Sequence, residues 1–112
     1  MTLSLVDTLQ KMADQYDPVK AGKFKDDIAI QFMFSGAETA NHYLQIKKSK
    51  CTLHPGKNLY PKLTLKIDSE IWLAIWRGEL DWTQLLMQRK FVATGDFPLL
   101  AKLPQIFGPF SA

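Results

Sequence analysis

Apolar residues near the start of the chain recur at helical spacing. From Leu5 onward, large apolar residues follow in steps of four, three and four, so they share one side of a helix. Ser4, with Asp7 three residues later, can form a capping box in which each side chain accepts a hydrogen bond from the other residue's amide. The pattern predicts an amphipathic helix over about residues 2–16, which Asp17-Pro18 ends.

Strict alternation of apolar and polar residues, the period of a β-strand, begins after a connector over residues 19–27. Residues 28–35 place isoleucine and phenylalanine on one face and mostly smaller or polar residues on the other. Residues 43–48 and 51–54 follow, the second ending at a Pro-Gly turn, and these three strands are predicted to form an antiparallel meander. A fourth strand over residues 62–67 alternates apolar residues with lysine and threonine, so we expect one wet face of the sheet.

Short elements separated by Gly and Asp make up the last third of the chain. The pattern predicts a helix over residues 69–76 stopped by a glycine, and a second over residues 82–88 capped by the preceding aspartate. A short strand over residues 91–94 and a final helix over about residues 98–103 follow. Residues 104–110 hold two prolines and one glycine, so we expect that this apolar tail is not a regular helix throughout.

The composition indicates an ordered globular chain with a mildly basic surface. Its 112 residues are 46% hydrophobic and 22% charged, which predicts one domain over residues 1–112 with a real core. Residues 45–66 contain six lysines and no acidic residue, although the net charge of the whole chain is only +3. Such a cluster can face anionic headgroups, acyl-carrier phosphates or nucleic acid, or it can be a solvated strand face. We expect no nucleic-acid binding, because aromatic and basic residues do not interleave as in RNA-binding modules, and we keep a transient membrane contact through Lys47, Lys48 and Lys50.

The chain carries a single cysteine, Cys51, which fits a reducing compartment because no internal disulfide can form. The first residues show no charged region before an apolar run, and no apolar run reaches the roughly 20 residues that span a bilayer. We therefore expect a soluble, cytoplasmic protein. Cys51 itself is expected to be a small buried or half-buried residue rather than a catalytic thiol.

Catalytic chemistry is not indicated by the polar residues. The two histidines, His42 and His54, lack the spacings that place two metal ligands on one face. The carboxylates Glu70, Glu79 and Asp81 lie at predicted helix starts or turns, where helix capping explains them. We expect no catalytic residue, no metal and no cofactor.

Residues 62–104 resemble the sterol carrier protein type 2 domain family. The resemblance lies in Trp72-Leu73-Ala74-Ile75-Trp76-Arg77-Gly78-Glu79-Leu80-Asp81, Met87-Gln88-Arg89-Lys90-Phe91, Gly95-Asp96 and Lys102-Leu103. It implies an α+β fold, with a five-stranded mixed, mainly antiparallel sheet covered on one face by helices and an apolar tunnel between them. It also implies a ligand such as a fatty acid, acyl-coenzyme A, a sterol or an isoprenoid lipid.

Three departures from the family pattern bear on the ligand. Arg89 stands where a glycine is usual, Trp82 where a proline is usual, and Pro98 adds stiffness before the last helix. Extra indoles take up part of the cavity, so a sterol is less expected than an acyl chain or an isoprenoid tail. The chain also does not end in the peroxisomal signal of eukaryotic carriers, which favours a bacterial cytosolic version.

The C-terminal half has more apolar side chains than are needed to cover a sheet whose other face is exposed to solvent. The surplus either walls a cavity or forms a partner surface. For a cavity, the predicted lining residues are Phe32, Phe34, Trp72, Ile75, Trp76, Leu85, Leu86, Phe91, Leu99, Leu100, Leu103 and Phe107. Residues 106–110 would act as a lid, and Lys102 or Arg89 is a candidate to meet a carboxylate or headgroup at the mouth, with a purely surface role as the alternative.

Two hypotheses about function therefore remain open. The first is non-catalytic binding or transfer of a lipid or another long apolar small molecule. The second is a protein-interaction or dimerisation module, in which the same apolar residues bury against a second copy or a lipid or quinone biosynthesis enzyme.

Overall fold

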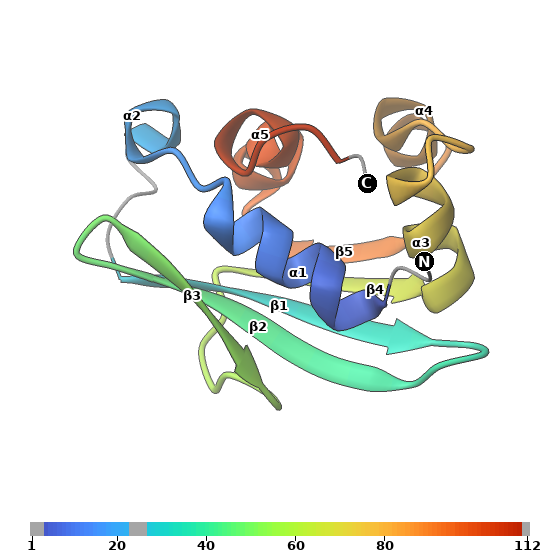
Figure 1. The fold of residues 1–112 in the computed structure, drawn as a ribbon, viewed down its shortest axis with the longest axis horizontal. Helices are drawn as coiled ribbons and strands as arrows, with labels where there is room; N and C mark the ends of the chain where they lie inside the picture. The colour runs from blue at the N-terminus through green and yellow to red at the C-terminus, as the bar shows by residue number, and fades with distance from the viewer. Residues whose placement is uncertain (1–3, 23–26, 111–112) are drawn as a thin grey trace.

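The computed structural model describes residues 4–22 and 27–110 as five helices and five strands around one sheet (Figure 1). In chain order the elements are α1 (Leu5–Asp14), α2 (Pro18–Ala21), β1 (Ile28–Ser35), β2 (Ala40–Lys47), β3 (Lys50–Pro55), β4 (Leu63–Asp68), α3 (Ser69–Trp76), α4 (Trp82–Met87), β5 (Val92–Gly95) and α5 (Phe97–Ile106). Within this part of the chain, no helix is both long and apolar enough to cross a lipid bilayer.

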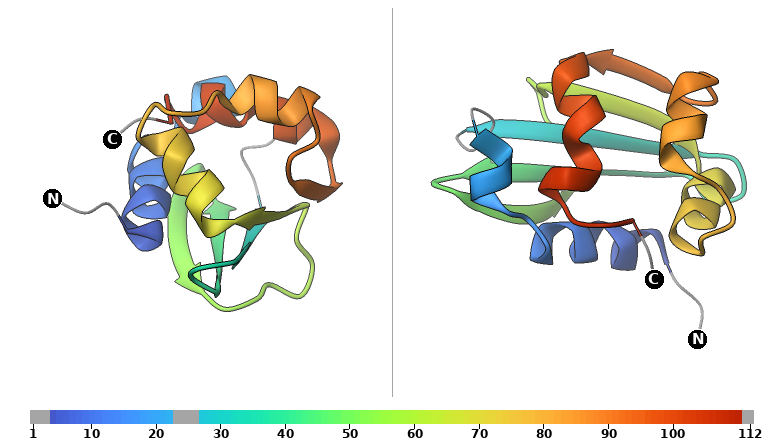
Figure 2. Two further views of the ribbon diagram at one scale, coloured as in Figure 1. Left: turned by 90° about the vertical axis from the view of Figure 1, so that its right-hand side faces the viewer. Right: turned by 90° about the horizontal axis from the view of Figure 1, so that it is seen from above.

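The sheet is mixed and mainly antiparallel, which confirms the predicted fold class. Its strand order is β3-β2-β1-β4-β5, so the first strand in the chain is the central one. The pairs β1–β2, β2–β3 and β4–β5 are antiparallel, and β1–β4 is parallel. The three views agree that the helices lie on one face of the sheet (Figures 1 and 2).

The core lies between this face and the helices. Because side chains alternate along a strand, the register aligns Phe32 of β1 with Leu65 of β4, and Ile30 with Leu44 of β2, all of them buried. Helix α1 packs against β3 and α3, while α5 packs against β4, β5 and α2. Trp72 on α3 donates a 2.7 Å hydrogen bond from its indole Nε1 to Oγ1 of Thr8 on α1, so a buried polar contact joins the two helices.

The predicted capping box at the start of α1 is present. Asp7 N donates to Ser4 Oγ at 3.0 Å, and Ser4 N donates to Asp7 Oδ2 at 3.3 Å. The helix ends at Asp14 instead of residue 16, and the predicted start at residue 2 lies outside the described residues. The segment after the helix is joined to the other end of the chain, since Asp17 N donates to Ile106 O at 2.9 Å and Gln15 Nε2 donates to Phe107 O at 2.8 Å.

Two local predictions were wrong. The connector expected over residues 19–27 includes the last residues of a short helix, α2, because Asp17 accepts hydrogen bonds from the amides of Val19 and Lys20. Helix α5 continues through Pro104 to Ile106 instead of ending near residue 103. Proline removes one hydrogen bond, but Phe107 N still donates to Leu103 O at 2.9 Å, and the side chain of Ile106 is fully buried. Burial of the apolar face therefore outweighs the lost hydrogen bond.

The outer face of the sheet is less exposed to solvent than the alternation of residues predicted. On β1, Ala29 and Gln31 point away from the helices and are nevertheless buried. The cause is the loop between β3 and β4, residues 56–62, which crosses beneath the sheet (Figure 2, left). Lys62 N donates to Ala29 O at 2.8 Å, which fixes the end of this loop to the central strand.

Candidate ligand-binding site

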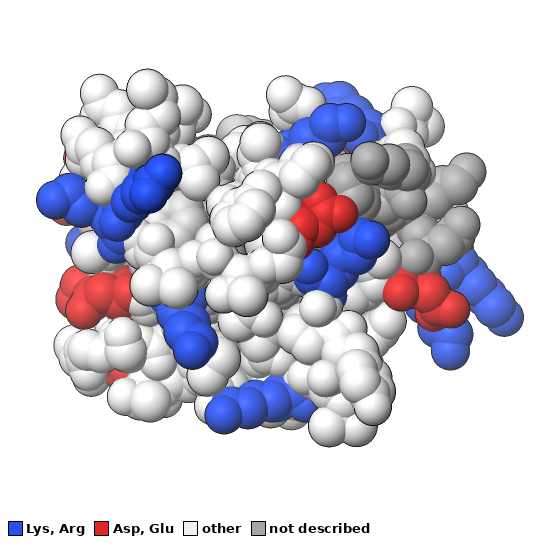
Figure 3. All heavy atoms as spheres, turned by 180° about the vertical axis from the view of Figure 1, so that it is seen from behind, with Lys and Arg blue, Asp and Glu red and all other residues white. Residues whose placement is uncertain are grey.

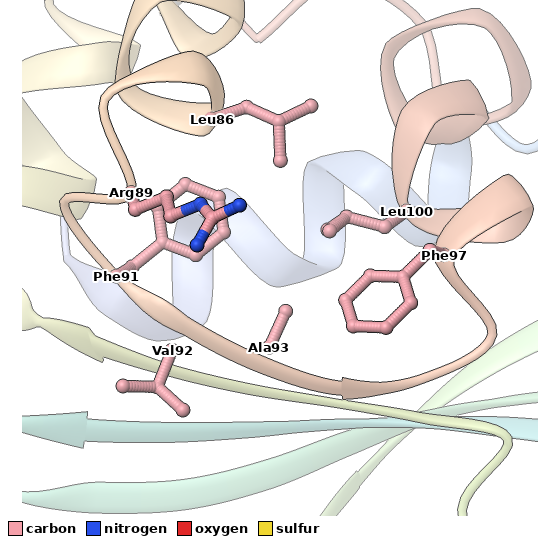
Figure 4. A pocket seen from close by; sticks show the side chains of 7 residues that line it. All are labelled: Leu86, Arg89, Phe91, Val92, Ala93, Phe97 and Leu100. Carbon is pink, nitrogen blue, oxygen red and sulfur yellow. The ribbon is translucent and has the colours of Figure 1, made fainter.

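A cleft of about 670 Å³ lies between α4, β5 and α5. It is lined by Leu86, Arg89, Phe91, Val92, Ala93, Phe97 and Leu100 (Figure 4). Figure 4 shows Leu86 and Leu100 on facing helices above the cleft, with the methyl group of Ala93 pointing up from β5. The lining is apolar except for the Arg89 guanidinium, so the cleft suits an apolar ligand with at most one anionic group.

Two turns place α4 and its arginine at this cleft. Asp81 starts the helix, because its Oδ1 accepts hydrogen bonds from Thr83 N at 2.7 Å and Gln84 N at 3.3 Å. The helix ends in a Schellman turn, in which Lys90 N donates to Leu85 O at 3.0 Å and the Arg89 amide donates to a carbonyl of the last turn. Arg89 therefore has a positive φ of 55°, which glycine adopts freely and other residues adopt at a cost. This backbone requirement accounts for the glycine that the family pattern has at this position.

The opposite wall of the cleft is fixed where β5 turns into α5. Asp96 Oδ1 accepts a hydrogen bond from Leu99 N at 3.0 Å, and Asp96 Oδ2 lies 3.6 Å from Lys62 Nζ. Gly95 has a φ of 119°, and a Cβ atom there would lie 2.3 Å from Lys62 O. Only glycine permits this close approach, so β5 and α5 are held tightly against the start of β4.

An aromatic cluster fills the interior next to the cleft. The ring of Phe110 lies 5.6, 5.4 and 5.3 Å from the rings of Trp72, Trp76 and Trp82 respectively. Trp82 also stacks on Phe91 at 5.0 Å, so a residue of the cleft is part of the cluster's wall. The buried Nε1 atoms of Trp76 and Trp82 have no hydrogen-bond partner among the described residues. An unpaired buried donor costs about 1–3 kcal/mol, so this packing holds two donors that another oxygen atom could satisfy.

The structure divides the predicted lining residues into two groups. Leu86, Phe91 and Leu100 line the cleft. The others belong to the packed core, namely Phe32, Phe34, Trp72, Ile75, Trp76, Leu85, Leu99, Leu103 and Phe107. The cavity that the described residues form here is a cleft, and the predicted tunnel stays a prediction.

Several lining residues were not identified from the sequence. Val92 and Ala93 line the cleft because β5 is the edge strand of the sheet, and Phe97 lines it from the start of α5. The short strand was recognised, but its position at the edge depends on long-range pairing with β4. Of the two cations considered for the mouth, Arg89 lines the cleft, and Lys102 is an exposed residue of α5.

Among the described residues that line the cleft there is no carboxylate, histidine, thiol or hydroxyl group. Burial raises the pKa of the Cys51 thiol from 9.0 to about 12, with a smaller contribution from the Asp14 carboxylate, so this group stays protonated at neutral pH. His54 lies on β3, where its Nε2 is 2.8 Å from Thr52 Oγ1 and its ring stacks on Tyr43. In residues 4–22 and 27–110, no cluster of three or more His, Cys, Asp or Glu residues could hold a metal ion. On the side where β5 lies, much of the middle of the surface is uncharged, with both basic and acidic side chains around it (Figure 3).

Sequence comparison connects this geometry with known proteins. The sequence pattern of the SCP-2 sterol transfer family matches residues 9–108. Hydroxysteroid dehydrogenase-like protein 2 of Xenopus tropicalis is 29% identical over 83 residues, which cover 73% of this chain and 20% of that protein, and the Xenopus laevis protein gives the same values. This chain therefore spans about a fifth of the length of these curated relatives.

Solved structures with the same fold include both a small domain and part of a larger enzyme. A double mutant of the sec-alkyl sulfatase PisA1 matches with a TM-score of 0.77 and 18% identity, over 98% of this chain and 18% of that chain. Palmitated SCP2L2 from Aedes aegypti matches with a TM-score of 0.72 and 24% identity, over 95% of this chain and 96% of that chain. At these identities the structural matches establish the fold alone.

Proposed function

The chain belongs to the SCP-2 sterol transfer family, and on that premise we propose that it binds a long apolar lipid in the cleft between α4, β5 and α5. The proposed ligand is an acyl or isoprenoid chain, which the protein carries without changing it chemically. A bulky sterol fits less well, because Trp82 and its neighbours fill the interior next to the cleft.

The observation that carries this proposal is the apolar lining of a cleft of about 670 Å³. Burial of methylene groups stabilises a complex by about 0.8 kcal/mol each, so a dozen of them contribute roughly 10 kcal/mol before the costs of association and ordering. Arg89 is the charged residue of the lining, and no ion pair within the described residues occupies it. A carboxylate or phosphate at the end of the apolar chain would therefore have a partner at the mouth.

The packed aromatic cluster fills the interior beyond the cleft, so the predicted tunnel requires this cluster to open. Phe110 contacts all three indoles, and Phe91 joins the cluster to the cleft. We propose that the tail carrying Phe110 moves when a long ligand enters, so that the core residues predicted to line a tunnel come into contact with it. The indole N–H groups of Trp76 and Trp82 would then gain a partner if the ligand carries an oxygen atom.

A non-catalytic role and a cytoplasmic location belong to the same proposal. The cleft offers apolar contacts and one guanidinium, which can bind and orient a lipid. The single cysteine is half-buried with a raised pKa, which suits a protein of a reducing compartment.

The proposal is tested by lipid extraction and by filling the cleft. Purified protein is extracted with organic solvent for lipid mass spectrometry, and displacement of a fluorescent fatty acid is measured in solution. The variant A93W places an indole in the cleft and should abolish displacement, whereas A101W, on the exposed surface of α5, should leave displacement unchanged. Circular dichroism checks that both variants fold. An extract free of lipid together with no displacement by the unmodified protein would contradict the proposal.

The alternative of a dimerisation or interaction module stays a prediction, and light scattering tests it. A stable dimer whose tryptophan fluorescence does not respond to any added lipid would favour that alternative.

A further inference from the structure

The loop between β3 and β4, residues 56–62, presents two adjacent large side chains to solvent. Leu59 is 86% exposed and Tyr60 is 88% exposed. The loop runs on the face of the sheet opposite the helices, away from the core (Figure 2, left). Two adjacent, largely exposed apolar side chains have an energetic cost in water, which contact with a binding partner would remove.

This loop is held in place by a buried amide. Gln31 of the central strand is only 2% exposed, and its Nε2 donates to Gly56 O at 3.0 Å and to His42 O at 3.1 Å. Its Oε1 accepts a hydrogen bond from Asn58 N at 2.7 Å, and Asn58 Oδ1 in turn accepts one from Tyr60 N at 2.9 Å. The exposure of the two apolar side chains is therefore built into the fold, because the sheet fixes the backbone on both sides of them.

The same face of the sheet is basic. Lys47, Lys50 and Lys66 alternate with buried residues and so point away from the helices, and Lys57 is an exposed residue of the loop. A hollow of about 600 Å³ on this face is lined by Lys47, Lys48 and Lys50 together with Tyr43, Gln45, Thr52 and His54, and Asp27 also lines it. Residues 45–66, which supply most of this surface, contain no acidic residue. An anionic partner is therefore complementary to this face, at about 1 kcal/mol for each lysine near an anionic membrane.

We propose that this open face of the sheet docks onto an anionic phospholipid bilayer, with Leu59 and Tyr60 inserted at the interface and the lysines facing the headgroups. A tyrosine beside an aliphatic residue is typical of membrane interfaces, where the ring has one apolar and one wet end. The lysines on the same face provide the second signal that reversible membrane binding requires.

The choice of a lipid surface over a protein partner rests in part on the proposed function, because a bilayer would be the source of the ligand. The loop ends beside one wall of the cleft, since Asp96 N donates to Lys62 O at 3.0 Å and the two side chains form an ion pair. Phe97, the next residue, lines the cleft and is 60% exposed. The docked loop is therefore joined directly to the segment that forms one wall of the cleft.

Sedimentation with vesicles tests the proposal on the full chain. Vesicles of phosphatidylcholine with phosphatidylserine should bind the protein, and vesicles of pure phosphatidylcholine should bind it much less. The double variant L59S/Y60S should lose about tenfold in partitioning or more, and K57Q about fivefold. The matched control is V19S, since Val19 is an equally exposed apolar residue, 87% exposed, on α2 on the other side of the sheet, and it should bind like the unmodified protein.

A fluorescent label reports the contact directly. In a C51A background, an environment-sensitive dye attached to Y60C labels one site. Its emission should shift to the blue with anionic vesicles, whereas the same dye on V19C should not respond.

Three results would overturn the proposal. They are an unmodified protein that does not bind anionic vesicles, an L59S/Y60S variant that binds them normally, and self-association that L59S/Y60S abolishes in the absence of vesicle binding. The last result would assign the face to a second copy of the chain. Fatty-acid displacement without vesicles is measured in parallel, and L59S/Y60S should retain it. If the unmodified protein shows no fatty-acid displacement, the proposed ligand site is contradicted, and the result on vesicle binding is unaffected.

Discussion

Replacing Arg89 by glycine should stabilise the protein. Arg89 follows α4 in a Schellman turn with a φ of 55°, a conformation that costs a non-glycine residue about 1–2 kcal/mol. Glycine removes this cost but adds entropy to the unfolded chain, worth roughly 0.5–1 kcal/mol in the opposite direction. We therefore expect R89G to raise the free energy of unfolding by about 0.5–1 kcal/mol, which for a domain of this size raises Tm by about 2–5 °C.

The same molecule contains the matched control for this prediction. Helix α3 ends in an equivalent turn, in which Glu79 N donates to Ala74 O at 2.9 Å and Gly78 has a φ of 79°. A Cβ atom at Gly78 would meet no heavy atom within 4 Å, so a side chain there has room and only the backbone conformation opposes it. The variant G78R should therefore lower stability by about the amount that R89G gains, and the double variant should be close to the unmodified protein.

Thermal unfolding followed by circular dichroism measures both changes. A Tm for R89G at or below that of the unmodified protein, with a clear loss in G78R, would refute the idea that the backbone of Arg89 is under strain. R89G also removes the cation of the cleft, so palmitate should bind up to about fivefold more weakly while hexadecanol is unaffected. Equal losses for both ligands would show that the guanidinium does not meet a carboxylate.

Three further predictions concern the interior. The variant T8V leaves the buried indole N–H of Trp72 without its acceptor and should lower the free energy of unfolding by about 1–3 kcal/mol in denaturant, whereas T83V on the surface of α4 should change it little. If T8V lowers stability by the same amount in the W72F background, the hydrogen bond is not the cause. The unfolded thiol of Cys51 loses its proton near pH 9 and the folded one near 12, so stability should fall as the pH rises through this window, and C51A should remove that fall. In F110A, solvent reaches the three indoles, so their emission should shift to the red with a loss of about 1–3 kcal/mol; unchanged emission would show that Phe110 does not cover them.

Local chemistry could be predicted from the sequence because neighbouring residues determine it. Asp81, which starts α4, was identified from its position before an apolar run, and it accepts amide hydrogen bonds as expected. The alternation over β1 likewise identified Ile30 and Phe32 as inward-facing residues. Both signals depend only on the geometry of the local backbone.

Features that depend on distant segments could not be predicted in this way. Gln31 looked like a solvent-facing residue, yet residues 56–62 cross over it and use its amide. Periodicity also shows that a side chain faces inward, but not whether the interior beside it is filled, so Trp72 and Leu86 looked alike although only Leu86 lines the cleft. Helix α5 passes Pro104 because the burial of Ile106, a tertiary effect, outweighs a local one.

The hydrogen bonds that join Gln15 and Asp17 to the carbonyls of residues 106 and 107 have a consequence for protein synthesis. A chain leaves the ribosome with its N-terminus first, at about 5–20 residues per second. The apolar side of α1 emerges early, but its last tether is made only when the final helix has been translated. A ribosome that stalls shortly before residue 106 therefore holds a nascent polypeptide in which the segment after α1 still lacks these hydrogen bonds.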